Sequence, residues 1–261
     1  MRVTRTLKLL WAFSKAEIQE AMTYRLGGLA WVINGSITSL LMMYIWTLVT
    51  TDHSQIVTYF LGIIFISRLT GSWSFGDIAE RIKDGSLSQT LLKPYHYMFE
   101  IFAHDMGAKL NRLISMVPYI IILGFIFSSN LSLPSLSKII ISVPAILAGY
   151  SIEFLFGITL GLLTNWTGDA DGIGRLYETV SNLASGYLVP FFLMPILLRS
   201  VLDFTPFRYF VSFPIEILQN KLSPGKIILG YSILTGWITL LILLFKLMDR
   251  TSMKSFSAHG N

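Results

Sequence analysis

The chain of 261 residues contains no cysteine, and only 13% of its residues are charged. The missing cysteine excludes disulfides and thiolate metal sites, and it leaves the redox compartment open. Soluble domains carry about 25% charged residues. The low charge, the 53% of hydrophobic residues and a mean hydropathy of +0.62 therefore indicate a protein that lies in a lipid bilayer.

Motifs for catalysis and metal binding are also missing. The sequence has no His-Glu-x-x-His or Gly-x-Ser-x-Gly motif, and its four histidines lack metal-ligand spacing. Asp169 and Asp171 resemble the start of a calcium loop whose later ligands are absent, so we expect no metal site. Without a phosphate-binding loop, any ATPase must be a separate chain. No basic stripe with interleaved aromatics indicates nucleic-acid binding.

Six apolar stretches are long enough to cross a bilayer, which takes about 20 residues each. The sequence therefore predicts an all-α, polytopic membrane protein that forms one domain over residues 1–261. The fourth span contains Pro144 and a small-xxx-small motif, Gly157 and Gly161, which would permit close helix approach. The fifth contains Pro190 and Pro195. The six predicted spans are 27–49, 56–76, 107–128, 138–164, 174–197 and 226–248.

The distribution of Lys and Arg predicts the orientation. If the N-terminus is cytoplasmic, most of the 20 basic residues lie inside or at the inner edge. The positive-inside rule then favours both termini in the cytoplasm. Residues 1–25 precede the first span and predict an amphipathic helix in the inner interface. Trp11 would anchor this helix, with Tyr24 and Arg25 at the entry to the first span.

A charged segment at residues 77–105 lies on the predicted cytoplasmic side. Gly85 would end one helical turn, and Ser86 with Gln89 fits a capping box that starts a second short helix. This helix would carry an apolar face and stop at a lysine-proline pair. Such a helix either packs on its own bundle or offers its face to a cytoplasmic partner. The face consists of Leu87, Leu91 and Leu92, and the stop of Lys93 and Pro94.

The aromatic-rich segment 198–225 precedes the sixth span and is too broken by proline to cross a bilayer. We expect short helices at the outer interface, where aromatic residues and arginine are stable. They would form either a lid over an exit path or an aromatic belt. The residues singled out are Pro206, Phe207, Arg208, Tyr209, Pro214 and Glu216.

Two ionisable residues fall inside predicted spans, Arg68 in the second and Glu153 in the fourth. Intramembrane charges are functional candidates because they are costly to bury unpaired. Both lie at similar depth, so the sequence suggests an Arg68–Glu153 ion pair. The pair would either fix helix packing or line a substrate path.

Three stretches together resemble the permease subunits of ABC transporters of the ABC-2 exporter superfamily, in a branch formerly of unknown function. Residues 19–25 are similar to its Tyr-Arg entry to the first span. Residues 85–94 fit its coupling pattern, Gly-x-Leu-x-x-x-Leu-Leu-(Lys/Arg)-Pro. Residues 206–209 and 213–218 are similar to its outer segment before the last span. The layout agrees over nearly the whole chain.

The resemblance implies a bacterial cytoplasmic-membrane permease with six spans, a second permease subunit beside it, the same chain or a related one, and ABC ATPase subunits beneath. ATP and Mg would be bound by the ATPase, and this chain would hold no cofactor. The helix at 86–93 would enter a groove of the ATPase. Leu87, Leu91 and Leu92 would make buried contacts there, and Lys93 a charge-assisted one.

The substrate class follows only from the scarcity of charge in the spans, which favours a hydrophobic or amphipathic cargo. Two other functions compete with the exporter. A regulatory membrane protein would use the same cytoplasmic helix to bind another partner. A gradient-driven transporter would need more intramembrane acids than Glu153.

Overall fold

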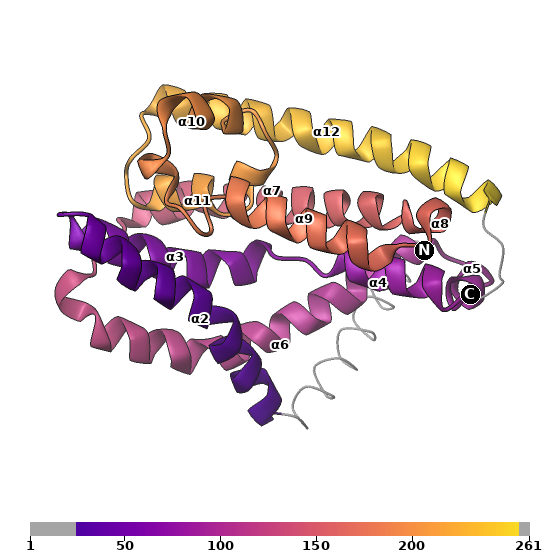
Figure 1. Cartoon of the computed structure of the whole chain (residues 1–261), viewed down its shortest axis with the longest axis horizontal. Coiled ribbons are helices and arrows are strands. Elements are labelled where there is room, and N and C mark those ends of the chain that lie inside the picture. Colours follow the sequence, from indigo (N-terminus) through magenta and orange to yellow (C-terminus); the bar gives the residue numbers. More distant parts are fainter. Residues whose placement is uncertain (1–24, 256–261) are drawn as a thin grey trace.

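The structure is a computed structural model that describes residues 25–255, and helices account for nearly all of them (Figure 1). Trp11 and Tyr24 lie outside the described residues, and Arg25 is the first residue of α2. The helices are α2 (Arg25–Val49), α3 (His53–Thr70), α4 (Ser74–Lys83), α5 (Leu87–Leu91), α6 (Tyr97–Ile126), α7 (Leu136–Gly161), α8 (Thr164–Thr167), α9 (Ala170–Ala184), α10 (Ile196–Leu202), α11 (Ser212–Leu218) and α12 (Pro224–Ser255), with short 3-10 turns η1 (Ser128–Asn130), η2 (Phe191–Leu193) and η3 (Phe207–Tyr209).

Four of the described helices, α2, α6, α7 and α12, are long and apolar enough to cross a membrane. The pair α3 and α4 makes a fifth span if its two helices are counted together across a bend of 45°. One end of the molecule gathers α4, α5, α8 and the C-terminal end of α12, and the opposite end gathers α10, α11 and the start of α3 (Figure 1). The all-helical membrane architecture is thereby confirmed for residues 25–255.

The predicted second span, 56–76, is interrupted at residues 71–73. The N–H of Gly71 still donates to the carbonyl of Ser67, and α4 starts afresh at Ser74. A helix break at membrane depth is tolerated where other groups satisfy the freed backbone. The break turns the chain away from the axis of α3 and places α4 against α7.

The predicted fifth span, 174–197, is wrong as a single helix. Helix α9 ends at Ala184 after 15 residues, which is about 22 Å of helix. A bilayer core is about 30 Å thick. Gly186, directly after the C-cap Ser185, has φ +86°, a left-handed conformation that ends a helix. Pro190 and Pro195 then flank the 3-10 turn η2, and neither can donate the backbone hydrogen bond that a resumed helix would need.

The sequence had suggested that the segment 198–225 lies at the outer surface, but only part of it does. Helix α10 is exposed, but the chain then enters the bundle, and α11 packs against α3 and α7. Six hydrophobic residues that follow Arg208 in this stretch belong to the main apolar core. They are Tyr209, Phe210, Val211, Phe213, Ile215 and Ile217.

The Gly157 and Gly161 motif of α7 permits the close helix approach that the sequence predicted, and its partner is α4. A Cβ at Gly157 would lie 2.6 Å from Ser74 Oγ and 3.1 Å from the backbone nitrogen of Phe75. A Cβ at Gly161 would collide with Ile78, whose side chain is fully buried. The Ser74 hydroxyl also donates to the carbonyl of Phe154 at 2.8 Å.

We predict that Gly157→Val lowers the thermal unfolding midpoint of the purified protein in detergent, since over-packing costs about 1–3 kcal/mol. Gly124→Val is the matched control, because Gly124 also lies inside a long helix and a Cβ there has no neighbour within 4 Å. Equal midpoints for the two variants would show that the α4–α7 contact is not close-packed.

Candidate coupling site

Helix α5 connects α4 to α6 at the end of the molecule where α12 finishes (Figure 1). Its first residue, Leu87, is fully buried and belongs to a core cluster with Ile78 of α4, Ile101 of α6 and Phe245 of α12. This corrects the prediction that Leu87 contacts a partner protein. The side chain instead anchors α5 to its own bundle.

The C-terminal end of α5 and the residues after it face outward, and we call Leu91, Leu92, Lys93 and Pro94 the coupling tip. Leu91 is 42% exposed and Leu92 is 88% exposed. Lys93 and Pro94 are exposed as well. Leu91 and Leu92 form a small exposed apolar patch beside Lys93, and covering such a patch would remove apolar surface from water, which is favourable.

The start of α5 is stabilised differently from the predicted capping box. The side chain of Ser86 makes no cap hydrogen bond. Asp84 Oδ1 accepts the N–H of Ser86 at 2.8 Å, and this hydrogen bond lowers the pKa of Asp84. Gly85 has φ +76°, a conformation that glycine adopts without strain. The turn between α4 and α5 therefore depends on the Asp84-Gly85 pair.

Arg81 of α4 joins three helices through its guanidinium group. Its Nε lies 2.5 Å from Asp77 Oδ1 on the same helix, and its Nη1 lies 2.9 Å from Glu100 Oε1 of α6. The same Nη1 donates to Thr90 Oγ1 of α5 at 3.2 Å. His104 Nδ1 of α6 lies 3.0 Å from Asp77 Oδ2. We call these residues the Arg81 network.

Glu100 extends the Arg81 network to the coupling tip. Lys93 Nζ lies 2.6 Å from Glu100 Oε2, and the Tyr95 hydroxyl donates to the same oxygen at 3.2 Å. The hydrogen bond to Glu100 raises the pKa of Lys93. Because Glu100 accepts from both Lys93 and Arg81, a displacement of the coupling tip acts directly on α4 and α6.

The beginning of α6 is also tied to the end of α12. The Tyr97 hydroxyl donates to Asp249 Oδ1 at 2.7 Å, and His96 Nε2 lies 3.2 Å from Asp249 Oδ2. The two rings stack with centroids 4.5 Å apart. This contact links the loop after the coupling tip to a helix that runs the length of the molecule.

The structure does not bring Arg68 and Glu153 together. The guanidinium of Arg68 packs against the backbone at Gly35 of α2. Glu153 Oε1 accepts the N–H of Ser72 at 3.3 Å, in the break between α3 and α4. Among the ion pairs of residues 25–255, none joins Arg68 to Glu153, since the two side chains leave their helices toward different neighbours.

Two residues of α6 satisfy the same helix break. Lys109 Nζ donates to the carbonyl of Leu69 at 3.0 Å and also to that of Gly71. Asp105 Oδ1 accepts the N–H of Trp73 at 2.9 Å. Lys109 is buried, with its ammonium 4.4 Å from the centre of the Tyr150 ring. Charged side chains here replace the backbone partners that a continuous helix would have supplied.

A second buried charge cluster lies in the segment 203–216. Arg208 Nη2 lies 2.5 Å from Glu216 Oε2, and Nη1 contacts Asp203. Arg208 also lies over the Phe191 ring, 4.6 Å from its centre. Of the other residues predicted here, Pro206, Tyr209 and Pro214 are buried and Phe207 is half-buried against Phe156. These contacts hold η3 and the start of α11 inside the bundle.

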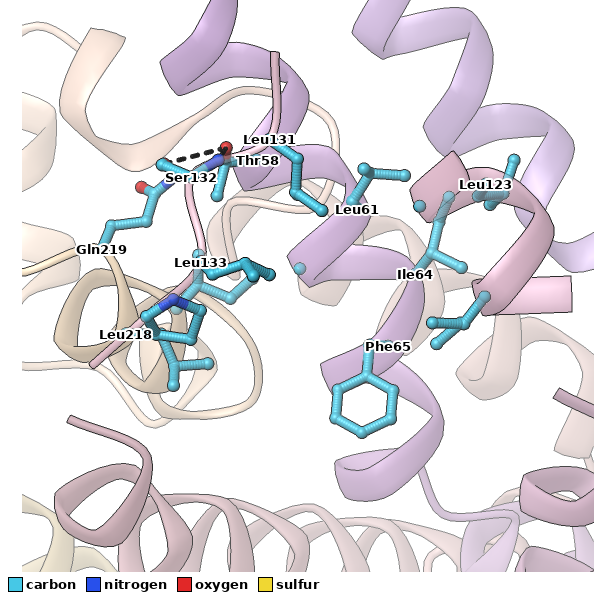
Figure 2. Close-up of a pocket in the computed structure, with 15 residues that line it drawn as sticks. Thr58, Leu61, Ile64, Phe65, Leu123, Leu131, Ser132, Leu133, Leu218 and Gln219 are labelled. Carbon is cyan, nitrogen blue, oxygen red and sulfur yellow. Dashed lines mark hydrogen bonds between the residues drawn. The ribbon is translucent and has the colours of Figure 1, made fainter. Parts of the chain in front are cut away.

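Two cavities differ in the character of their walls. The apolar cavity, of about 240 Å³, lies between α3, α6, α11 and the loop that leads into α7. Figure 2 shows Leu61, Ile64 and Phe65 of α3 on one side and Leu133 with Leu218 on the other. The polar cavity, of about 820 Å³, lies between α4, α7 and α9 and includes Glu153 in its wall.

Sequence reasoning found the coupling tip but missed the residues that hold it. The i,i+4 spacing of Asp77 and Arg81 was a readable signal for a helical ion pair. Nothing in the sequence joins Arg81 to Glu100, 19 residues away, or Tyr97 to Asp249, 152 residues away. These contacts depend on the tertiary arrangement of α4, α6 and α12.

The described residues thus form a multi-helix bundle, with four or five helices able to cross a membrane and a short helix whose apolar end is exposed outside them. The family model described as "ABC-2 family transporter protein" matches residues 44–260, and the chain belongs to that family. The match covers both the coupling tip and the segment 198–225. Family membership implies an ABC ATPase partner in general. Comparison with curated proteins finds no relative that matches.

We predict that Leu87→Ala lowers the unfolding midpoint strongly, whereas Leu92→Ala leaves it nearly unchanged. A buried leucine truncated to alanine costs about 2–5 kcal/mol, and an exposed one costs little. The two variants make the same chemical change five residues apart, so each controls for the other in a thermal unfolding experiment. Equal midpoints would contradict the burial of α5 described above.

A second prediction concerns the buried Arg208–Glu216 pair. Glu216→Gln removes one partner of a buried ion pair and is expected to cost about 3 kcal/mol. Asp171→Asn is the control, because its pair with Lys83 is exposed and such pairs contribute about 0–1 kcal/mol. Thermal unfolding in detergent distinguishes them, and a similar small effect for both would assign the buried pair no role in stability.

Proposed function

We propose that the chain is the permease subunit of an ATP-driven exporter in a bacterial cytoplasmic membrane. It moves a hydrophobic or amphipathic substrate outward by alternating access. A separate ABC ATPase binds ATP and Mg and docks on the coupling tip, so the end of the molecule that carries α5 faces the cytoplasm, together with both chain termini.

The observation that carries this proposal is the contrast between the two ends of α5. Leu87 is fully buried, while Leu92 five residues later is 88% exposed. Leu91 and Leu92 are exposed side by side at the end of the helix, and a partner that covers both would gain the free energy of burying their apolar surface. A helix anchored at one end and exposed at the other can accept a partner and still transmit its motion.

The contacts around α5 give that motion a physical route. The Arg81 network joins α5 to α4 and α6, and the Gly157–Gly161 face locks α4 to α7. Tyr97 and Asp249 join the start of α6 to α12. ATP binding would bring the ATPase subunits together, displace the coupling tips and shift the populations of inward-facing and outward-facing states.

A second permease subunit, either this chain or a related one, completes the transporter. The exposed apolar residues of α9 support such a neighbour, because Leu176 and Leu183 are 67% and 54% exposed and a second subunit would cover them. The apolar cavity supports a hydrophobic or amphipathic substrate, since most of its lining residues are apolar (Figure 2).

The test is co-purification of the tagged permease with an ABC ATPase encoded beside it, in nanodiscs. Leu92→Asp places a charge on the coupling tip and is expected to abolish ATPase capture without unfolding the permease. Leu133→Asp is the matched control, because Leu133 is 82% exposed at the opposite end. Capture by wild type and the control but not by Leu92→Asp supports the proposal. Equal capture by both variants, or none by wild type, overturns it and favours a regulatory or gradient-driven protein.

A further inference from the structure

The polar cavity extends along α9 from Ala170 to Asn182, a helix length of about 18 Å. Asp84, which precedes α5, and Asp171, near the start of α9, also line it. Its volume of about 820 Å³ is within the range of small-molecule sites, which hold ligands in about 300–1,000 Å³. A drug-sized molecule therefore fits between α4, α7 and α9.

The wall of this cavity is negatively charged. Five lining residues are acidic and two are basic. One of the basic residues, Lys83, is occupied by Asp171 at 3.4 Å. The acidic residues are Glu80, Asp84, Glu153, Asp171 and Glu178. A cavity with this balance attracts cations and disfavours anions.

Glu153 is the acidic residue of α7. Its carboxylate accepts a long hydrogen bond from the N–H of Ser72 at 3.3 Å. Lys109 of α6 interacts with it electrostatically, but the ammonium of Lys109 binds the carbonyls of Leu69 and Gly71, and within residues 25–255 no lysine or arginine forms an ion pair with Glu153. A carboxylate at membrane depth is costly unless a cation compensates it. The polar cavity gives a cationic ligand access to this group.

Three aromatic residues also line the cavity, Trp73, Phe75 and Tyr177. Trp73 is 62% exposed, and Phe75 lies with its ring centre 6.1 Å from that of Tyr177. Tyr177 is fixed in turn by stacking on Phe156 at 5.6 Å. Aromatic faces attract organic cations within about 6 Å, and the attraction is stronger where water is excluded.

We propose that the polar cavity binds a monovalent organic cation that carries apolar or aromatic groups, with Glu153 facing its charge and Trp73, Phe75 and Tyr177 contacting its apolar part. The claim that this class of ligand is the transported substrate rests on the proposed function. Its binding requires only the cavity.

A metal ion does not fit the same observations. The described residues contain no group of three His, Asp or Glu side chains close enough to hold one. The aromatic rings also offer no coordinating oxygen to a hard metal cation, whereas they complement the apolar surface of an organic cation. The chemistry of the wall therefore selects the ligand class.

Binding is measured on the full chain in nanodiscs without any ATPase, with tetraphenylphosphonium as the probe and empty nanodiscs subtracted. Tetraphenylborate, an anion of nearly the same size and shape, is the matched probe. We expect saturable binding of the cation and none of the anion. Saturable binding of both, or of neither, overturns the proposal.

Variants assign the site. Glu153→Gln and Glu178→Gln are each expected to weaken binding of the cation, the first by about tenfold or more, because each removes an attractive charge. Glu178 is exposed, so its variant folds even where Glu153→Gln does not. Glu153→Asp keeps the charge and should restore part of the affinity. Unchanged affinity in both glutamine variants would overturn the assignment.

The binding assay and the co-purification assay can fail separately. Selective cation binding that depends on Glu153, together with no ATPase capture, leaves the cavity proposal intact and refutes the exporter. ATPase capture with equal binding of tetraphenylphosphonium to wild type and both glutamine variants refutes the cavity proposal alone.

Discussion

The close contact between α4 and α7 is the constraint on which the rest of the structure depends. It requires two glycines, Gly157 and Gly161, because any side chain there would meet Ser74, Phe75 or Ile78. It also requires that α3 stop at Thr70, since a straight continuation of α3 would not bring α4 onto this face. The break exposes backbone groups at membrane depth, and Lys109, Asp105 and Glu153 satisfy them. The buried charges that look expensive in the sequence are thus the groups that make a broken helix stable in a bilayer.

Once α4 is fixed on α7, the Arg81 network fixes α5 and the start of α6 on α4. Glu100 is shared by Arg81 and Lys93, so the exposed coupling tip and the buried helices belong to one connected set of contacts. Arg81 and Glu100 are only partly exposed, and solvent screens such an ion pair less than one at an open surface. A partner that moves the coupling tip would therefore move α4 and α6 with it, rather than bend a loose loop.

Much of this architecture could be predicted from the sequence, because long apolar runs and the Gly-Leu-Leu-Lys-Pro pattern are local signals. The helices α2, α6, α7 and α12, the short α5 and the Gly157–Gly161 contact all follow from such signals. The fifth span could not be predicted, since hydropathy does not show that α9 ends before Gly186, whose φ is +86°, or that Pro190 and Pro195 then redirect the chain. The aromatic segment 198–225 was likewise predicted at the outer interface, although much of it is buried. Its Arg208 suggested a surface, yet Glu216 and Asp203 neutralise it in the interior. Partners that are distant in sequence decide whether a charge is buried, and periodicity carries no information about them.

In the proposed exporter, helix α4 would take part in both coupling and ligand binding. Its Asp77 and Arg81 belong to the network around α5, while Gly76, Ala79, Glu80 and Lys83 line the polar cavity. Both groups of residues lie on a helix of only about three turns, so a tilt of α4 that displaces the network residues also displaces the residues that line the cavity. In the proposed exporter, a ligand that favours one position of α4 would change the affinity of the coupling tip for the ATPase, and the ATPase would change ligand affinity by the same factor. Coupling across a membrane subunit of this size thus needs no long chain of intermediates, because the cavity and the docking surface are joined by one short, tightly packed helix.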